Sequence, residues 1–181
     1  MSEPRFETQP ELSSEFKEKL ELIIREPRME DCDDLVEVYN SIDTEEPRPP
    51  VAIKSTTREE FLPRLERIID GINDGKQVCF VVEKDGHVVG LIGGGLSEEA
   101  VDIPTVSAGF IGVKKEARSL KLFRQLSSTW LERIKEEWGA KKVITETNVS
   151  NPVLKLYKRM GFKEVGLAER KDYVKLEMMI E

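Results

Sequence analysis

A tyrosine near the C-terminal end of the chain lies where its hydroxyl could enter a functional cleft. Residues 156–162 read Leu-Tyr-Lys-Arg-Met-Gly-Phe. This pattern predicts a short helix that Gly161 ends, followed at once by a strand that starts on Phe162. Tyr157 then lies one turn inside the helix, from where its hydroxyl can reach a cleft. The residues leave a second interpretation open, a core tyrosine with a hydrated hydroxyl.

A second group of residues could bind an anion. Five basic side chains surround the start of a long amphipathic pattern in an otherwise acidic chain: Lys114, Lys115, Arg118, Lys121 and Arg124. The N-terminus of a helix offers free N–H donors and a favourable dipole, which suit a phosphate group. We interpret the basic cluster as an anion site next to the start of this helix.

Composition limits the class of protein. A chain of 181 residues fits one domain, and 35% charged with 39% hydrophobic residues is ordinary for a soluble protein. The net charge of -7 argues against a general affinity for nucleic acid. No apolar run is long enough for a membrane helix, and the first residues lack the apolar region of a secretory signal. Cys32 and Cys79 are too few for a disulfide framework or metal knuckle, so we expect reduced thiols, a cytoplasmic location and no metal.

The first half of the chain alternates strand and helix patterns. Residues 1–20 are polar and predict a surface arm, whereas residues 21–181 form the domain. The predicted elements of this half are a strand at 22–25, a helix at 31–42, a proline-rich loop at 46–50, a helix capped by Thr57, and strands at 78–82 and 87–92. Asp85-Gly86 between the last two is a strong hairpin signal. Gly93, Gly94 and Gly95 continue the second strand and favour a bulge or a close backbone approach.

The second half completes one sheet. A strand at 105–113 precedes the longest helix, Arg118 to Trp138, which Gly139 ends. A strand from Val143, the Tyr157 helix and strands at 162–165 and 173–180 follow. In the last strand alternate apolar residues predict one well-buried face. The fold class is therefore α/β: a single domain with a mixed, mostly antiparallel central sheet flanked by helices.

This order and several of its segments resemble the GCN5-related N-acetyltransferase (GNAT) superfamily. Residues 23–31 look like the family's first strand and the entry to its first helix, and residues 78–92 match its second and third strands. Residues 111–118 are similar to its strand-to-helix core motif, and residues 151–162 match its late motif closely. The resemblance covers residues 22–180. Only the late motif is specific by itself, and the other segments gain weight from their order.

The resemblance implies an acyltransferase that moves an acetyl group from acetyl-CoA to a small-molecule or peptide amine by direct attack. It implies Tyr157 as the acid for the coenzyme A thiolate. It also implies a set of cofactor-binding residues: Ile111, Gly112 and Val113 on the strand, Arg118, Ser119, Leu120, Lys121, Leu122, Phe123 and Arg124 at the helix start, and Asn151. For the base we consider Glu146 and Glu83, each of which could instead be a solvated surface carboxylate. The family also makes a homodimer possible.

The helix start departs from the family pattern. That pattern has small residues where this chain has Lys121 and Phe123. Glycine lets backbone amides approach phosphate closely, whereas a lysine could compensate in part as a point charge. We expect Phe123 to face the core. The family's usual asparagine falls on Ser150, beside Asn151. These departures keep an alternative open, a GNAT-like binding or regulatory module without transfer activity. The acceptor would be selected by residues 44–54, residues 93–104 and the last hairpin.

Overall fold

The protein folds around a single seven-stranded sheet, described here from a computed structural model that covers residues 22–45, 54–97 and 103–180. The predicted arm at residues 1–20 lies outside the described residues. The strands are β1 (Ile23–Arg25), β2 (Gln77–Lys84), β3 (His87–Leu96), β4 (Thr105–Val113), β5 (Lys142–Asn148), β6 (Lys163–Leu167) and β7 (Tyr173–Met179). Their order in the sheet is β1-β2-β3-β4-β5-β7-β6. The β4–β5 pair is parallel and the other pairs are antiparallel.

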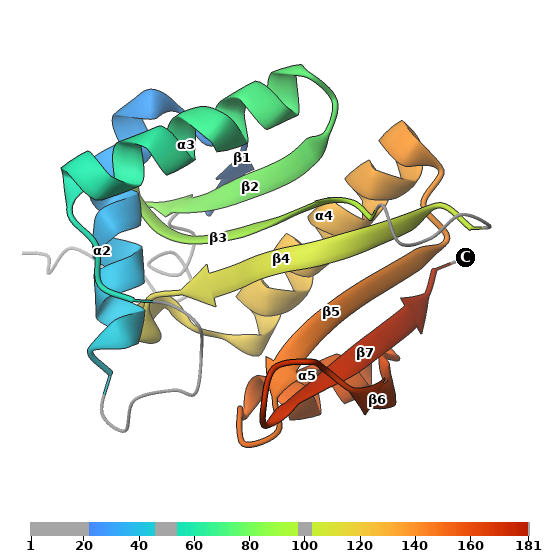
Figure 1. Cartoon of the computed structure of the whole chain (residues 1–181). Coiled ribbons are helices and arrows are strands. Elements are labelled where there is room, and N and C mark those ends of the chain that lie inside the picture. Colours follow the sequence, from blue (N-terminus) through green and yellow to red (C-terminus); the bar gives the residue numbers. More distant parts are fainter. Residues whose placement is uncertain (1–21, 46–53, 98–102, 181) are drawn as a thin grey trace, which may run out of the picture.

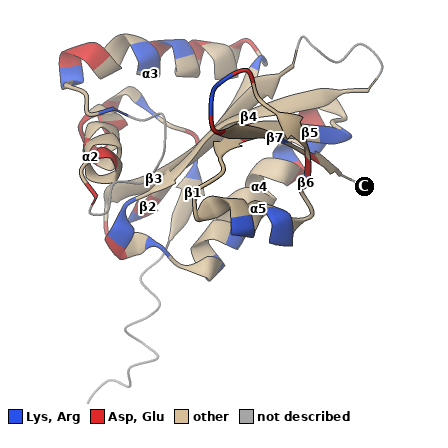
Figure 2. Cartoon of the chain, turned by 60° about the horizontal axis from the view of Figure 1, so that its bottom comes forward, with Lys and Arg blue, Asp and Glu red and all other residues tan. Residues whose placement is uncertain are grey.

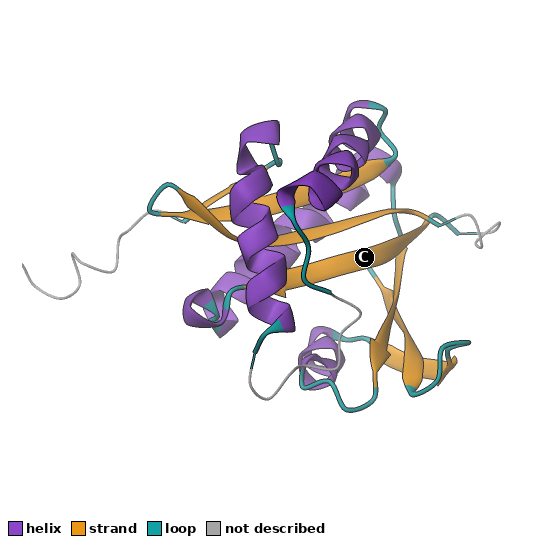
Figure 3. Ribbon diagram, turned by 60° about the vertical axis from the view of Figure 1, so that its left-hand side comes forward, coloured by secondary structure: helices purple, strands orange, loops and turns teal. Residues whose placement is uncertain are grey.

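Helices cover both faces of the sheet (Figures 1 and 3). They are α2 (Cys32–Asp43), α3 (Arg58–Asn73), α4 (Leu120–Trp138) and α5 (Val153–Met160), with 3₁₀ turns η1 (Met29–Asp31) and η2 (Lys115–Ala117) before α2 and α4. The α2 and α3 helices pack on one face, and α4 and α5 pack on the other (Figure 1). This arrangement confirms the predicted α/β class, the mostly antiparallel sheet and the order of its elements. Among the described residues, no helix is both long and apolar enough to span a membrane.

The two faces of the sheet form two separate cores because successive strand residues point to opposite sides. On β2, Val78, Phe80 and Val82 pack into the core beneath α4 and α5. Cys79 and Val81 point the other way, into the core beneath α2 and α3. On β7 the predicted alternation is confirmed, because its buried apolar residues all belong to the α4–α5 side: Val174, Leu176 and Met178.

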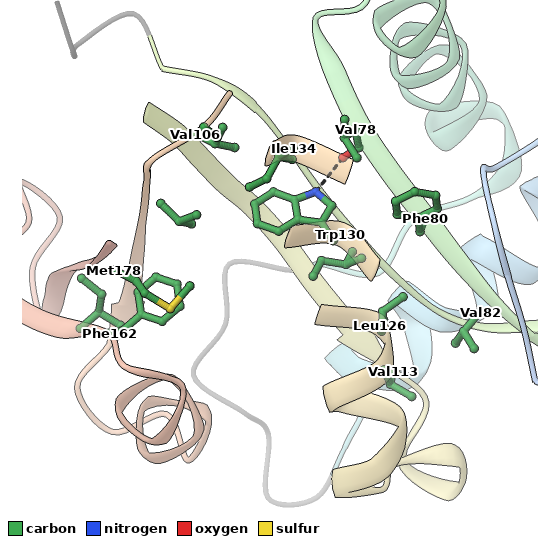
Figure 4. Packing of buried hydrophobic residues seen from close by; sticks show 14 of the residues in the cluster. Val78, Phe80, Val82, Val106, Val113, Leu126, Trp130, Ile134, Phe162 and Met178 are labelled. Carbon is green, nitrogen blue, oxygen red and sulfur yellow. Dashed lines mark hydrogen bonds between the residues drawn. The ribbon is translucent and has the colours of Figure 1, made fainter. Parts of the chain in front are cut away.

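Trp130 of α4 lies at the centre of the larger core (Figure 4). Its indole Nε1 donates a hydrogen bond to the carbonyl oxygen of Val78 at 3.0 Å, which leaves no polar atom of this buried ring unpaired. The ring packs so close to Gly94 that a Cβ there would lie 2.7 Å from its Cζ2 atom. The register of β3 against β4 shifts between Gly93 and Gly94. The predicted bulge and close approach at the glycine run are therefore confirmed.

The ends of the helices follow local signals, with one exception. Thr57 caps α3 by accepting a hydrogen bond from the Glu60 amide, as predicted. Gly139 and Gly161 end α4 and α5 with φ of 58° and 103°, in the left-handed region that glycine favours. The predicted start of the long helix at Arg118 is wrong, because Ser119 has extended backbone and caps a helix that begins at Leu120.

Candidate active site

The central feature of the site is the place where β4 and β5 separate (Figure 1). The two strands pair only through residues 105–107 and 142–144. Just beyond this point the Thr145 hydroxyl donates a hydrogen bond to the Ala108 carbonyl at 3.1 Å, so a side chain replaces the backbone ladder. The β5 strand stays paired with β7 as far as Asn148. We call this divergence the β4–β5 fork, and it leaves one edge of β4 without a strand partner among the described residues.

The free edge of β4 presents backbone donors to the fork. The Lys114 amide donates to the Val89 carbonyl of β3 at 2.8 Å. Alternate amides of a strand point to opposite sides, and the register between residues 110 and 113 is regular. The N–H groups of Ile111 and Val113 therefore point away from β3, toward the fork.

A cavity of about 1310 Å³ occupies the fork. Its walls come from α2, α3, β4, α4, β5 and α5, so it reaches from one face of the sheet to the other. It brings together these candidate residues: Ile111, Gly112, Val113, Arg118, Ser119, Leu120, Leu122, Phe123, Glu146, Asn151 and Tyr157. Two candidates, Lys121 and Arg124, are exposed and do not line it. Sequence positions far apart thus meet in one cleft, which we call the fork cleft.

Tyr157 lines the fork cleft from α5. Its ring packs against the larger core and meets the ring of Phe162 edge-on, with centroids 5.2 Å apart. Its hydroxyl has no hydrogen-bond partner among the described residues. Because no described side-chain oxygen is both buried and unpaired, the hydroxyl oxygen must be at least partly accessible. Burial raises the pKa of Tyr157 to about 12. The ring is therefore a core group, while the hydroxyl remains a protonated donor.

The start of α4 supplies unpaired amides beside the cleft. The Ser119 hydroxyl accepts a hydrogen bond from the Leu122 amide at 3.0 Å, and the Ser119 carbonyl accepts one from Phe123 at 3.0 Å. The N–H groups of Leu120 and Lys121 have no acceptor among the described residues. These two donors lie at the positive end of a 19-residue helix. The geometry can bind an anion through the backbone.

The structure divides the basic cluster between ion pairs and the cleft lining, so its interpretation as one anion site stays a prediction. The Lys114 ammonium is mostly buried and pairs with Glu37 of α2 at 2.8 Å. The Arg118 guanidinium binds both carboxylate oxygens of Glu45, which follows α2, and its Nε donates to the Val113 carbonyl at 2.7 Å. Lys115 lines the cleft. The cluster is divided because two of its members pair with acidic residues that are far away in the sequence. Spacing along the sequence does not reveal such partners.

The two candidate bases differ in position. Glu146 is an exposed residue of β5 and lines the fork cleft. Glu83 lies at the far end of β2, outside the cleft lining, and accepts a hydrogen bond from Arg25 Nε at 2.9 Å. Arg25 also binds Asp31, and the hydrogen bonds to Asp31 first and to Glu83 second raise the pKa of Arg25. The structure thus excludes Glu83 as a group that acts in the cleft and leaves Glu146.

Two other cofactor-binding candidates, Phe123 and Asn151, also line the cleft. Phe123 is half-buried and lines the cleft, so the expectation that it faces the core is wrong. Leu122 takes the core position instead. Asn151 accepts a hydrogen bond from the Val153 amide at 3.1 Å and so fixes the first turn of α5 through its side-chain oxygen.

Sequence reasoning missed the α2–α3 wall of the cleft. Tyr39 of α2 packs between Phe61 and Phe110, with ring centroids 4.9 and 5.0 Å apart. The Arg64 guanidinium lies over the Tyr39 ring at 4.9 Å. In the sequence, Tyr39, Phe61, Arg64 and Arg67 each fit a helix pattern, which does not mark them as site residues. The only available signal was the three-residue spacing of Arg64 and Arg67, which places both on one side of α3.

Comparison with known proteins agrees with this geometry. Residues 35–162 match the model of the acetyltransferase (GNAT) family. An N-alpha-acetyltransferase of Sulfurisphaera tokodaii is 33% identical over 105 residues. The match covers 54% of this chain and 63% of that relative, so the chain spans less than two thirds of the relative's length.

Solved structures share the fold. A PaiA N-acetyltransferase from Thermoplasma acidophilum, solved in complex with coenzyme A, superposes with a TM-score of 0.69 at 17% identity and covers 88% of this chain and 99% of its own. A ribosomal-protein-S5-alanine acetyltransferase from Vibrio fischeri gives a TM-score of 0.72 at 13% identity, with 86% and 91% covered. At these identities the likeness concerns the fold alone. The family model matches well over half of the chain, and the chain therefore belongs to the acetyltransferase (GNAT) family.

Proposed function

We propose that this protein is an N-acetyltransferase that moves an acetyl group from acetyl-CoA to the primary amine of a small molecule or peptide. The observation that carries the proposal is the fork cleft, where unpaired backbone donors of β4 and α4 meet the free hydroxyl of Tyr157. Membership of the GNAT family and similarity to an N-alpha-acetyltransferase support an amine as the acceptor.

The cleft residues fit acetyl-CoA, which supplies an activated acetyl thioester when bound. The amides of Leu120 and Lys121 would hold its phosphates, as the start of a helix does for many anions. The Lys121 side chain does not line the cleft, so it does not fill the space that glycine leaves in the family pattern. The amides of Ile111 and Val113 would polarise the acetyl carbonyl and orient the neighbouring arm of the cofactor.

Tyr157 acts as the general acid in this proposal. As the amine nitrogen bonds to the acetyl carbon and the carbon–sulfur bond breaks, Tyr157 donates its proton to the departing sulfur. Burial of the ring raises the pKa of Tyr157 to about 12, so the hydroxyl is fully protonated near neutral pH. The same hydroxyl has no competing partner among the described residues, which leaves its proton available.

Glu146 takes up the proton that the attacking amine loses, directly or through water. The attack is direct, because neither cysteine is suited to form a covalent intermediate. Cys32 and Cys79 are buried, and burial raises the pKa of both thiols, that of Cys79 to about 12. Glu146 lines the cleft with no ion-pair partner among the described residues, so its carboxylate is free to accept the proton.

One observation favours a second candidate, a binding or regulatory module without transfer activity. The Arg118 guanidinium, which the family pattern assigns to the phosphates, is bound by Glu45. A cofactor phosphate would have to displace this carboxylate or bind beside it. In the second candidate the Glu45–Arg118 pair keeps the helix start closed to acetyl-CoA.

Thermal unfolding with and without acetyl-CoA separates the two candidates. A ligand that binds only the folded state stabilises it by about 2.7 kcal/mol at a hundred times its Kd, so the transferase should melt several degrees higher with the cofactor. Release of coenzyme A thiol in the presence of an amine then measures transfer. Absence of any melting shift at millimolar acetyl-CoA would refute the transferase. The same result would favour the module, whereas a shift would show that the helix start is open to acetyl-CoA and would count against the module.

A further inference from the structure

Two arginines of α3 form a cationic wall in the fork cleft. Arg64 and Arg67 both line the cavity, and both are exposed to it and to solvent. The α3 helix carries basic and acidic residues along its length (Figure 2). In a chain with 35 acidic and 28 basic residues, arginines usually have acidic partners nearby. Neither Arg64 nor Arg67 forms an ion pair with any residue that the structure describes.

Aromatic packing holds Arg64 in place. Its guanidinium lies 4.9 Å from the centre of the Tyr39 ring, which itself stacks on Phe110 at 5.0 Å with an interplanar angle of 19°. A cation over an aromatic face is stabilised without losing its hydrogen-bond donors. Burial raises the pKa of Tyr39 to about 12, and the charge of Arg64 opposes this rise. Arg64 is therefore a positioned cation and not a freely moving surface side chain.

The described acids of the same wall have other partners. Glu60 lies one turn before Arg64, but its carboxylate accepts hydrogen bonds from the Thr57 amide and the Thr56 hydroxyl in the capping box of α3. Glu45 binds Arg118. Among the acceptors that the structure describes, Arg67 donates only to the Pro63 carbonyl, at 3.2 Å. The charges of both cleft arginines are therefore available to a bound molecule.

The two sides of the cleft have opposite charge. The α3 wall contributes Arg64 and Arg67, whereas the β5 wall contributes the exposed Glu146 next to the fork. A molecule with an amine at one end and a carboxylate at the other matches this distribution. Arginine binds carboxylates well because its planar fork of donors can engage both oxygens.

We propose that the preferred acceptor is an amine that carries a carboxylate, with Arg64 and Arg67 binding the carboxylate while the amine reaches the fork. The inference rests on the proposed acetyl transfer and names its substrate class. The required chemistry is present in the N-terminus of a peptide with Asp or Glu at its first positions, and also in a free acidic amino acid. An acceptor without the negative charge leaves the two arginines unmatched.

The test compares acceptors that differ only in charge. We would measure kcat/KM with acetyl-CoA for peptides that begin with Asp or Glu and for their Asn and Gln twins, with free aspartate and glutamate as a separate arm. A charge-assisted hydrogen bond should favour the acidic peptide by about tenfold or more. Which arm reacts faster distinguishes the peptide from the amino acid. Binding of the same peptides in the presence of coenzyme A gives a readout that does not depend on turnover.

Variants locate the preference. The ratio of kcat/KM for the acidic acceptor to kcat/KM for its amide twin should fall in both Arg64→Gln and Arg67→Gln. In the double variant this ratio should be close to one. Arg67→Glu should reverse it in favour of acceptors with Lys or Arg, which loss of folding cannot produce. Arg58→Gln on the same helix is the matched control, because Arg58 lies outside the cleft and pairs with Asp33. It should keep the ratio.

The possible results are distinct. Equal kcat/KM for acidic and amide acceptors would overturn this inference while leaving the acetyltransferase intact. A ratio that survives in the double variant would also overturn it. If no amine is acetylated and acetyl-CoA does not stabilise the fold, the proposed function itself fails, and the inference fails with it.

Discussion

The proton-donor end of the fork cleft and its helix-start end are built in different ways. At the donor end, Tyr157 is held by its neighbours in sequence, the helix stop at Gly161 and the ring of Phe162. At the helix start, Lys114 and Arg118 are held by Glu37 and Glu45, which lie 77 and 73 residues earlier. A site made of local contacts can be read from a short motif. A site tied by distant ion pairs becomes visible only in the folded chain.

Removing the Tyr157 hydroxyl should cause the largest change. Loss of a general acid lowers turnover by about 10²- to 10⁴-fold, so we expect Tyr157→Phe to reduce kcat by at least a hundredfold while acetyl-CoA affinity changes little. Steady-state kinetics and a binding isotherm measure the two quantities. Tyr173→Phe removes another hydroxyl from the cleft wall and serves as the control. Unchanged turnover in Tyr157→Phe would mean that the donor end has no chemical role. The contrast between a proton-donor end and a helix-start end would then be wrong.

A methyl group at Gly94 should disturb the frame that both regions share. A Cβ there would contact the Ser107 carbonyl oxygen and lie 2.7 Å from Trp130 Cζ2, both of them fixed by packing. Overpacking of this kind costs about 1–3 kcal/mol, so Gly94→Ala should lower the melting temperature by several degrees. Gly109→Ala is the matched control on β4, since its Cβ would meet only the Gly93 carbonyl at 3.6 Å. Equal melting temperatures for the two variants would contradict the close approach.

Releasing Arg118 should affect the helix start alone. Glu45→Gln removes the carboxylate that neutralises the guanidinium, so we expect acetyl-CoA to bind about fivefold more tightly as a repulsive charge is lost. Arg118→Gln should weaken binding. Calorimetric titration at low and high salt measures both, and the difference should shrink as salt rises. If Glu45→Gln weakens binding instead, the pair positions the loop and does not compete with phosphate.

Of these four predictions, the effect of alkaline pH on kcat through Tyr157 should be the smallest. With its pKa raised to about 12, Tyr157 stays protonated below that value and loses its proton only as the pH rises through it. We expect kcat to show no decline attributable to Tyr157 up to about pH 10, close to the pKa of an ordinary tyrosine. Measurements of kcat by stopped assays from pH 7 to 10 would test this expectation. An alkaline decline that disappears in Tyr157→Phe would contradict the raised pKa.

Most of the fold could be predicted because its signals are local. Apolar spacing indicates α2, Asp85-Gly86 indicates the β2–β3 hairpin, and Gly139 marks the end of α4. The start of α4 was placed too early, since Arg118 fits the helix pattern as well as Leu120 does. Only the cap geometry of Ser119, with φ of -145°, decides between them.

The site could be predicted only where one element fixes a residue. The edge of β4 and Tyr157 follow from a strand and a short helix, and both reach the cleft. Apolar spacing does not predict the orientation of Arg64 and Phe123, because each lies on a helix face beside the core stripe. Which of two adjacent faces meets the cleft depends on how the helix is rotated against the sheet. No pattern within a single helix specifies that rotation.

The three-residue contact between β4 and β5 also has a mechanical consequence. Among the described residues, strands β1–β4 are joined to strands β5–β7 by backbone pairing only along this short seam, with the Thr145–Ala108 hydrogen bond at its end, while the core beneath α4 packs on both groups. A small rotation about such a seam changes the spacing of the far strand ends by a larger amount. A small rotation at the seam would therefore change the width of the cleft at Tyr157. Amides along the seam should accordingly exchange faster than those of the long β2–β3 ladder.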